Sequence, residues 1–272
     1  MEKYSVLMSL YKKERPEYLR IAIDSMLGQT VMPDEIVLVE DGPLTPELYE
    51  VVDEYQKKYP EIFTIIRNEK NLGLGLSLNL GLKACRNELV ARMDTDDVSK
   101  PDRCEKQLKR FEEKPELVIV GSHAEEFEGQ VDNVTSVRRV PLTSEEIYQF
   151  ARRRSPYNHP AVTYKKSVVL AHGGYANMRR NQDVDLFGRM TFSGCKGENV
   201  DEALLWFRNG TELSKRRKSW ENTRSYIATI RKFWKMGYSS FGDYLVVAVA
   251  QTGMYVMPLF IQNWVYRKWL RK

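Results

Sequence analysis

Three aspartates lie within four residues in the string Asp94-Thr95-Asp96-Asp97. Carboxylates two residues apart in a loop can direct oxygen atoms at one cation, and Mg²⁺ or Mn²⁺ bound in this way completes its coordination with water and phosphate oxygens. The string therefore predicts a site that joins a divalent cation to a diphosphate. The alternative is an acidic surface turn in which Asp96 or Asp97 caps a helix near Pro101.

Polar side chains also follow two other apolar runs. Tyr11 follows residues 5–10, and Glu40 and Asp41 follow residues 36–39. The aspartate string comes directly after an apolar run in the same way. Ligands bind outside the carboxyl ends of the strands in an open parallel sheet. If the three runs are strands of one sheet, these polar groups meet at one of its edges.

Apolar runs alternate with helical patterns through about residue 121. The predicted strands are residues 5–10, 36–39, 63–66, 89–93 and 117–120, and the predicted helices are residues 16–27, 46–59, 76–84 and 101–113. This alternation predicts an α/β fold with a mostly parallel twisted sheet and helices on both faces. The order is less regular from residue 122 to about 209. There we expect a strand at 134–140 and helices at 144–154, 167–172 and 183–192.

The composition favours one large domain with a short appendage. The chain has 272 residues, of which 42% are hydrophobic and 29% charged, so it can bury a sizeable core. A net charge of +5 is a mild bias, and no nucleic acid is expected as a partner.

Cys85, Cys104 and Cys195 form no CxxC pair, which indicates free thiols in a reducing compartment. The first apolar run is too short for a signal peptide and predicts a strand of a cytoplasmic domain.

Several other catalytic motifs are absent from the sequence. There is no GxxxxGK[ST] phosphate loop, and no third glycine follows Gly73 and Gly75 at the dinucleotide-binding spacing. The chain has three histidines but no HExxH string, which argues against a zinc hydrolase.

The composition changes after about residue 210. A basic run at 215–218 precedes an aromatic and basic segment, and an apolar stretch of about 18 residues follows at 244–261. We favour a helix or helix pair that lies in a membrane interface. The alternatives are a membrane span, and a helix that packs on the catalytic domain or on a partner copy.

Taken together, the motifs resemble family 2 glycosyltransferases, which have the GT-A fold. In chain order the matching strings are SVLMSLY (5–11), SMLGQT (25–30), EIVLVEDG (35–42), NLG (71–73), NLG (79–81), RMDTDD (92–97), PDR (101–103), NHP (158–160), GGY (173–175), QDVDL (182–186) and Arg208. Within the family, the chain looks most similar to bacterial capsule and exopolysaccharide enzymes of the amylovoran type. The resemblance implies a GT-A catalytic domain over residues 1–212, with a nucleotide-binding half (1–121) and an acceptor half (122–212). Residues 213–272 would form a helical membrane-association segment.

The resemblance also implies a role for individual residues. Tyr11 would lie against the base of the nucleotide, Asp96 and Asp97 would bind Mn²⁺ or Mg²⁺, and Asp183 would be the catalytic base. The implied donor-binding residues are Leu10, Tyr11, Asp41, Arg92, Asp94, Thr95 and Arg103, and the implied acceptor residues are His159, Gln182, Arg216 and Arg217. The sequence departs from the family pattern at Glu40, where aspartate is usual, and at Phe187, where tryptophan is usual.

Alternatives remain for three of these residues or pairs. Asp183 could simply cap a helix, His159 could be a satisfied structural histidine, and Arg216 and Arg217 could belong to a solvated basic run. The predicted function is inverting, metal-dependent transfer of a sugar from a nucleotide sugar to a saccharide or polyprenyl-diphosphate-linked acceptor. A uridine nucleotide is expected. The protein would be peripheral at the inner face of the cell membrane, and a homo-oligomer is left open. A sugar-nucleotide nucleotidyltransferase and a non-catalytic polysaccharide-assembly protein are the alternatives.

Overall fold

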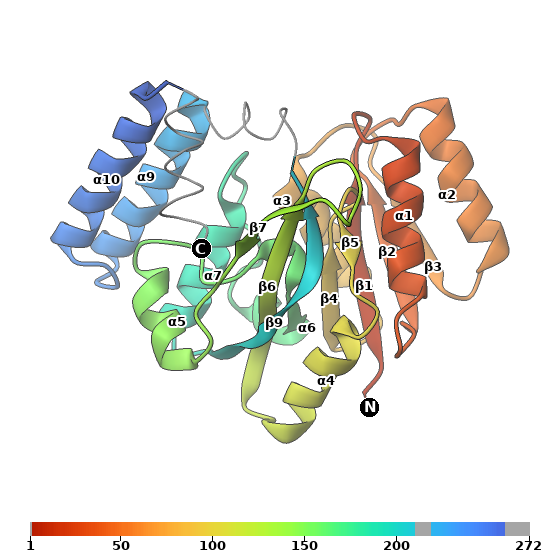
Figure 1. Cartoon of the computed structure of the whole chain (residues 1–272), viewed down its shortest axis with the longest axis horizontal. Helices are drawn as coiled ribbons and strands as arrows, with labels where there is room; N and C mark the ends of the chain where they lie inside the picture. The colour runs from red at the N-terminus through yellow and green to blue at the C-terminus, as the bar shows by residue number, and fades with distance from the viewer. Residues whose placement is uncertain (1, 210–218, 259–272) are drawn as a thin grey trace.

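Nine strands form one sheet at the centre of the computed structural model, which describes residues 2–209 and 219–258 (Figure 1). The strand order is β3-β2-β1-β4-β8-β6-β9-β5, and β7 pairs with β6. The first four strands along the chain are parallel. They are β1 (Tyr4–Leu10), β2 (Glu35–Glu40), β3 (Phe63–Arg67) and β4 (Leu89–Met93). The predicted parallel βα alternation is therefore confirmed over this half.

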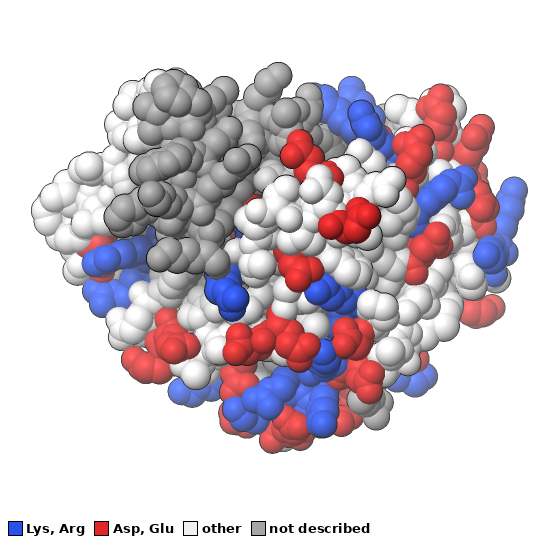
Figure 2. Space-filling view, in the orientation of Figure 1, with Lys and Arg blue, Asp and Glu red and all other residues white. Residues whose placement is uncertain are grey.

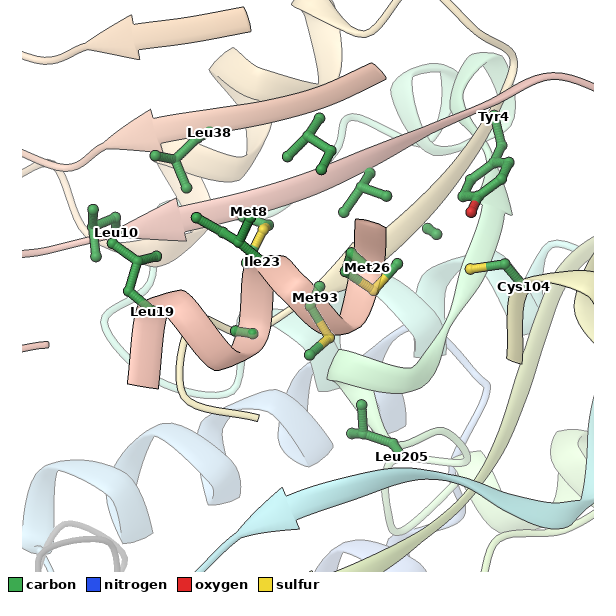
Figure 3. Packing of buried hydrophobic residues seen from close by; sticks show 14 of the residues in the cluster. Tyr4, Met8, Leu10, Leu19, Ile23, Met26, Leu38, Met93, Cys104 and Leu205 are labelled. Carbon is green, nitrogen blue, oxygen red and sulfur yellow. The ribbon is translucent and has the colours of Figure 1, made fainter. Parts of the chain in front are cut away.

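Helices cover both faces of the sheet, as predicted. One buried cluster joins the strands to α1 (Pro16–Leu27), α2 (Pro46–Lys58) and α4 (Arg103–Glu113), and Figure 3 shows part of it. A second cluster on the other face includes residues of α3 (Leu74–Ala84) and α7 (Gln182–Phe192). The shorter helices on that face are α5 (Ser144–Ala151) and α6 (Lys166–Ala171), with the 3₁₀ turn η1 (His159–Ala161) beside the sheet. Because apolar side chains on both faces are covered, β1, β2 and β4 are nearly continuous hydrophobic runs.

The second half of the sheet is mixed. The short strand β8 (Thr163–Lys165) lies antiparallel between β4 and β6 (Leu117–Phe127). β6 in turn runs parallel to the 13-residue strand β9 (Lys196–Arg208). Two further strands complete the sheet, β5 (Val98–Ser99) and β7 (Val134–Arg138). We did not expect β5, β8 or β9 from the sequence. β9 is hard to recognise because its first half carries exposed charges and its pairing with β6 contains register shifts.

Two C-terminal helices form an antiparallel hairpin at one end of the molecule. α9 (Trp220–Lys235) and α10 (Phe241–Val256) pack on α5 and α7 through a third buried cluster. Within residues 2–209 and 219–258, no helix has both the length and the hydropathy needed to cross a bilayer. The predicted apolar stretch at 244–261 lies partly in α10, and its last residues fall outside the described part of the chain.

A capping box holds the start of α10. Ser240 and Asp243 bond reciprocally, and both Arg152 and Arg153 pair with the buried Asp243 carboxylate. Burial raises the pKa of Asp243, but the main-chain N–H of Ser240 and the guanidinium of Arg153 outweigh it and bring this pKa down to about 2. The hairpin is thus tied by charge to the segment that follows α5.

Candidate active site

Strand register brings the predicted polar groups to one edge of the sheet. Leu10 pairs with Glu40, and Met8 pairs with Met93, so the segments after β1, β2 and β4 leave the sheet side by side. Tyr11, Asp41 and the aspartate string therefore share this edge, as the sequence predicted. Tyr11 is partly exposed there.

Asp94, Asp96 and Asp97 form a compact acidic cluster. Each offers a carboxylate oxygen within 4.8 Å of the others. Burial, the charge of Asp94 and the charge of Glu14 raise the pKa of Asp96 to about 7. Burial and the neighbouring charges of Asp96 and Asp94 raise the pKa of Asp97 well above its usual value. Asp96 and Asp97 resist ionisation in this way, so the cluster is suited to a cation, which would compensate the crowded charges.

Two further observations show that the cluster fits a divalent cation. Asp97 has a buried carboxylate oxygen, Oδ2, that has no hydrogen-bond partner among the described residues. Three carboxylates are also the hard oxygen donors that Mg²⁺ and Mn²⁺ prefer. The alternative in which Asp96 or Asp97 caps the next helix is wrong, because α4 begins at Arg103 and its N-cap is Asp102.

Arg208, the last residue of β9, holds the loop that carries the cluster. Its main-chain N–H donates to Asp97 Oδ1 at 2.8 Å, and its Nε donates to the Asp96 carbonyl at 2.7 Å. The guanidinium also lies 3.8 Å from the ring centre of Tyr18 and 4.5 Å from that of Phe127. Arg208 is therefore a positioning residue for the acidic cluster. The sequence strings included it but gave it no role.

Arg92 is a buried cation at the centre of the site. Its guanidinium pairs with Asp94, while its Nε and Nη1 have no hydrogen-bond partner within the described part of the chain. The positive charge of Arg92 lowers the pKa of Asp96 and of Asp183, so both carboxylates lie within its electrostatic reach. Arg92 thus connects the cluster to the predicted base.

Three other predicted donor residues lie behind this edge. Arg103 is fully buried and donates to the carbonyls of Arg92 and Val162 at 2.7 and 3.3 Å, so it supports β4 from within the protein. Leu10 has its side chain in the core, and its carbonyl accepts from the Asp41 N–H. The Thr95 hydroxyl donates to Glu14 at 2.9 Å. The side chains of Arg103 and Leu10 are thus positioned to support the site from the protein interior.

Asp41 organises the loop at 71–73. Its carboxylate accepts from the side-chain amide of Asn71 at 2.9 Å and from the main-chain N–H groups of Leu72 and Gly73 at 2.6 and 3.1 Å. Gly42 has a φ of +87°, and a Cβ there would lie 2.6 Å from the Asn71 nitrogen. Both the positive φ and the close approach require glycine.

Glu40 points elsewhere, which resolves the departure at this position. Its buried carboxylate pairs with Arg67 at 3.2 Å. The longer side chain is therefore used to join β2 to β3.

Asp183 lies in the first turn of α7 and is partly buried. Burial raises its pKa, while the main-chain N–H of Val184 and its own N–H lower it, as does Arg92. The preceding Asn181 is the only non-glycine residue with a positive φ (59°) in the described ranges, and it is the N-cap of this helix. Asparagine adopts this left-handed conformation more readily than most residues. Gln182 is buried and packs against Gly75. A Cβ at position 75 would lie 3.3 Å from the Cγ of Gln182.

His159 makes structural contacts next to the site. Its Nε2 lies 2.9 Å from the hydroxyl of Tyr175, which is 3.3 Å from that of Tyr164. Burial and the charge of Arg92 lower the pKa of His159 well below its usual value, so the ring is neutral. Phe187 is buried against His159 and is not exposed for acceptor stacking. Arg216 and Arg217 lie outside the described residues.

The family model for glycosyl transferase family 2 matches residues 5–185, which include the acidic cluster and Asp183. The chain belongs to glycosyl transferase family 2. This membership makes it a glycosyltransferase and decides against the nucleotidyltransferase and non-catalytic alternatives. The predicted resemblance is confirmed.

Two named glycosyltransferases match nearly the whole chain. A UDP-Gal:alpha-D-GlcNAc-diphosphoundecaprenol beta-1,3-galactosyltransferase of Escherichia coli is 34% identical over 99% of this chain and 97% of its own length. The amylovoran biosynthesis glycosyltransferase AmsE of Erwinia amylovora is 35% identical over 97% and 98% of the two chains. This family 2 enzyme is thus similar to glycosyltransferases of capsule and exopolysaccharide synthesis.

A solved structure shares the fold. The mannosyltransferase PcManGT of Pyrobaculum calidifontis, in complex with GDP-Man and Mn²⁺, superposes with a TM-score of 0.66 at 14% identity and covers 97% of this chain and 79% of its own. The fold of this glycosyltransferase is GT-A, as predicted.

Proposed function

We propose that the enzyme transfers a sugar from a uridine diphosphate sugar with inversion at the anomeric carbon, and that transfer requires Mn²⁺ or Mg²⁺. The observation that carries the proposal is the acidic cluster at the sheet edge, with Asp183 and Asp96 both within electrostatic reach of Arg92. The name of the E. coli relative supports the uridine nucleotide, and the Mn²⁺ in the PcManGT complex supports the metal.

In the proposed reaction, the acceptor hydroxyl oxygen attacks the anomeric carbon while the bond from this carbon to the diphosphate oxygen breaks. The electron pair of that bond leaves with UDP, and the acceptor proton passes to the Asp183 carboxylate. A cation held by Asp96 and Asp97 would neutralise charge on the leaving diphosphate. Arg92 favours the ionised form of Asp183, which is the form a base requires. With one base opposite the leaving group there is a single displacement, so the configuration inverts.

We also propose that the acceptor is a polyprenyl-diphosphate-linked sugar or a growing polysaccharide. The name of the E. coli relative includes a diphosphoundecaprenol-linked acceptor. Gln182 precedes Asp183 in α7, and the ring of His159 packs against Phe187 of the same helix, so both would contribute to the acceptor site. An acceptor fixed in the bilayer would require a peripheral enzyme at the cytoplasmic face, with residues 1–212 as catalytic domain and 213–272 as membrane-association segment.

The test is release of UDP from a panel of UDP-sugars by the purified chain, with Mn²⁺ present or removed by EDTA. We expect cation-dependent release for one donor and loss of transfer in Asp183→Asn. Asp53→Asn is the matched control, because it makes the same change at an exposed position of α2, where the carboxylate pairs with Arg67 at 3.6 Å. Rates are compared per folded molecule. Near wild-type transfer by Asp183→Asn would reject the assignment of the base.

A further inference from the structure

The outer face of α10 is apolar and exposed. Five large hydrophobic side chains on this helix have between 50% and 71% of their surface exposed. They are Phe241, Leu245, Val246, Val249 and Val256. Soluble proteins rarely collect so many exposed apolar side chains on one helix, and such a patch marks an interaction site.

Aromatic side chains lie at both ends of this face. Trp234 of α9 stacks on Tyr244 with ring centres 5.5 Å apart and also contacts Phe241. At the other end, Trp220 contacts Tyr255 at 5.3 Å. Tryptophan and tyrosine beside an apolar surface are typical of the boundary between lipid headgroups and acyl chains.

Exposed cations on α9 accompany the apolar face. Arg224, Arg231 and Lys235 are exposed along this helix. In Figure 2 the left edge of the molecule, where Figure 1 places α10, is formed by uncharged residues, and lysine or arginine atoms gather below it. An apolar face flanked by cations fits an anionic lipid surface. A symmetric pair of hairpins from two copies would instead bring these like charges together.

The hairpin is also fastened to the loop that precedes Asp183. The Ser225 hydroxyl donates to the Arg180 carbonyl at 2.9 Å, and the Asn181 amide donates to the Asn222 carbonyl at 3.3 Å. Lys232 of α9 also pairs with a buried aspartate of α7. A surface that holds the hairpin therefore also sets the position of the acceptor side of the site.

We infer that the outer face of α10, together with the cations of α9, docks on an anionic lipid bilayer and holds the acceptor side of the site at the bilayer surface. The inference rests on the proposed lipid-linked acceptor for its purpose. Its test needs neither donor nor acceptor, so the two can fail separately.

The experiment is flotation of the full chain with vesicles of phosphatidylglycerol and phosphatidylethanolamine, and with vesicles of phosphatidylcholine alone. We expect the wild type to float with the anionic vesicles. Val249→Asp should lower the partition coefficient onto these vesicles about tenfold. Ile21→Asp is the matched control, because it places the same charge on an exposed β-branched position of α1. Melting curves establish that both variants are folded. The inference would be overturned if both variants lost flotation to the same extent, or if Val249→Asp floated as well as the wild type.

A second pair of measurements separates lipid from protein as the occupant. Arg231→Gln with Lys235→Gln should weaken binding to anionic vesicles about fivefold per cation and leave binding to neutral vesicles unchanged. Light scattering of the wild type should give a monomer in the absence of lipid. A dimer that Val249→Asp dissociates, with no flotation of the wild type, would show that a second copy covers this face.

Discussion

Replacing Arg208 by alanine should weaken cation binding without unfolding the enzyme. The side chain donates to the Asp96 carbonyl at 2.7 Å and to the Gly129 carbonyl at 3.0 Å, and it lies between the rings of Tyr18 and Phe127. The bond from the main-chain N–H of residue 208 remains in the variant. The loop of the acidic cluster therefore loses its side-chain support but keeps its main-chain tie.

The magnitude follows from these contacts. A hydrogen bond from a charged donor contributes about 1.5–3 kcal/mol, and each ring contact of a cation contributes about 0.5–1 kcal/mol. Only the bond to Asp96 acts directly on the cluster, so we assign about 1.5 kcal/mol to cation affinity, which is about tenfold in the dissociation constant. The remaining contacts affect the stability of the fold.

The assay is calorimetric titration of Mn²⁺ into purified protein with saturating UDP, together with a melting curve. Arg110→Ala is the matched control, because Arg110 makes charged bonds to Glu113 and to Glu198 at the opposite end of β9. Arg208→Lys should recover part of the affinity, since it keeps the charge but loses the planar fork. Unchanged Mn²⁺ affinity in Arg208→Ala, or an equal loss in Arg110→Ala, would refute the role of Arg208.

Three further predictions concern other parts of the enzyme. Asp183→Asn should lower the transfer rate about 10²–10⁴-fold with donor affinity retained. The base ionises only above its raised pKa, so the wild-type transfer rate should fall as pH falls through that value. The pH–rate profile of the residual activity in the variant should lack this fall at acid pH. Gly42→Ala should destabilise the fold by about 2 kcal/mol or more, because the Cβ would lie 2.6 Å from the Asn71 nitrogen and φ is positive; an unchanged urea midpoint would contradict this. Asp243→Asn should lower the free energy of unfolding by about 1–2 kcal/mol at neutral pH, because the Asp243 pKa of about 2 in the folded state lies below the unfolded value. This figure is discounted because Arg153 is partly exposed to solvent. That stabilising contribution is present above about pH 4 and is lost toward pH 2, so urea unfolding should show wild type and variant converging in acid, and a constant difference would be inconsistent with it.

The first half of the fold could be predicted because its strands are buried on both faces. Apolar runs such as β1 and β2 leave little ambiguity, and each is followed by an amphipathic helix. β9 could not be predicted, since exposed charges interrupt its pattern and pairing with β6 supplies its stability. Helix starts were less certain: α4 begins at Arg103, two residues after the proline that suggested residue 101.

The positions of the candidate residues in the fold could be predicted better than their contacts. The strand pattern placed Asp41 and Asp96 at one sheet edge but could not show that Asp41 binds the 71–73 loop. Nor could it show that Arg103 faces the protein interior, or that Arg208 reaches across from β9 to the Asp96 loop. The Arg208 contact joins residues 112 positions apart and the Asp41 contact with Leu72 joins residues 31 positions apart, so only the tertiary structure shows them.

Anomalous scattering from a crystal grown with UDP and Mn²⁺ tests the central claim most directly. We predict a manganese peak bound by carboxylates of the Asp94–Asp97 string and by the diphosphate of UDP, with Asp183 nearby but not bound to the metal. A peak at another place on the molecule, or UDP bound at the sheet edge with no manganese at these aspartates, would contradict the account.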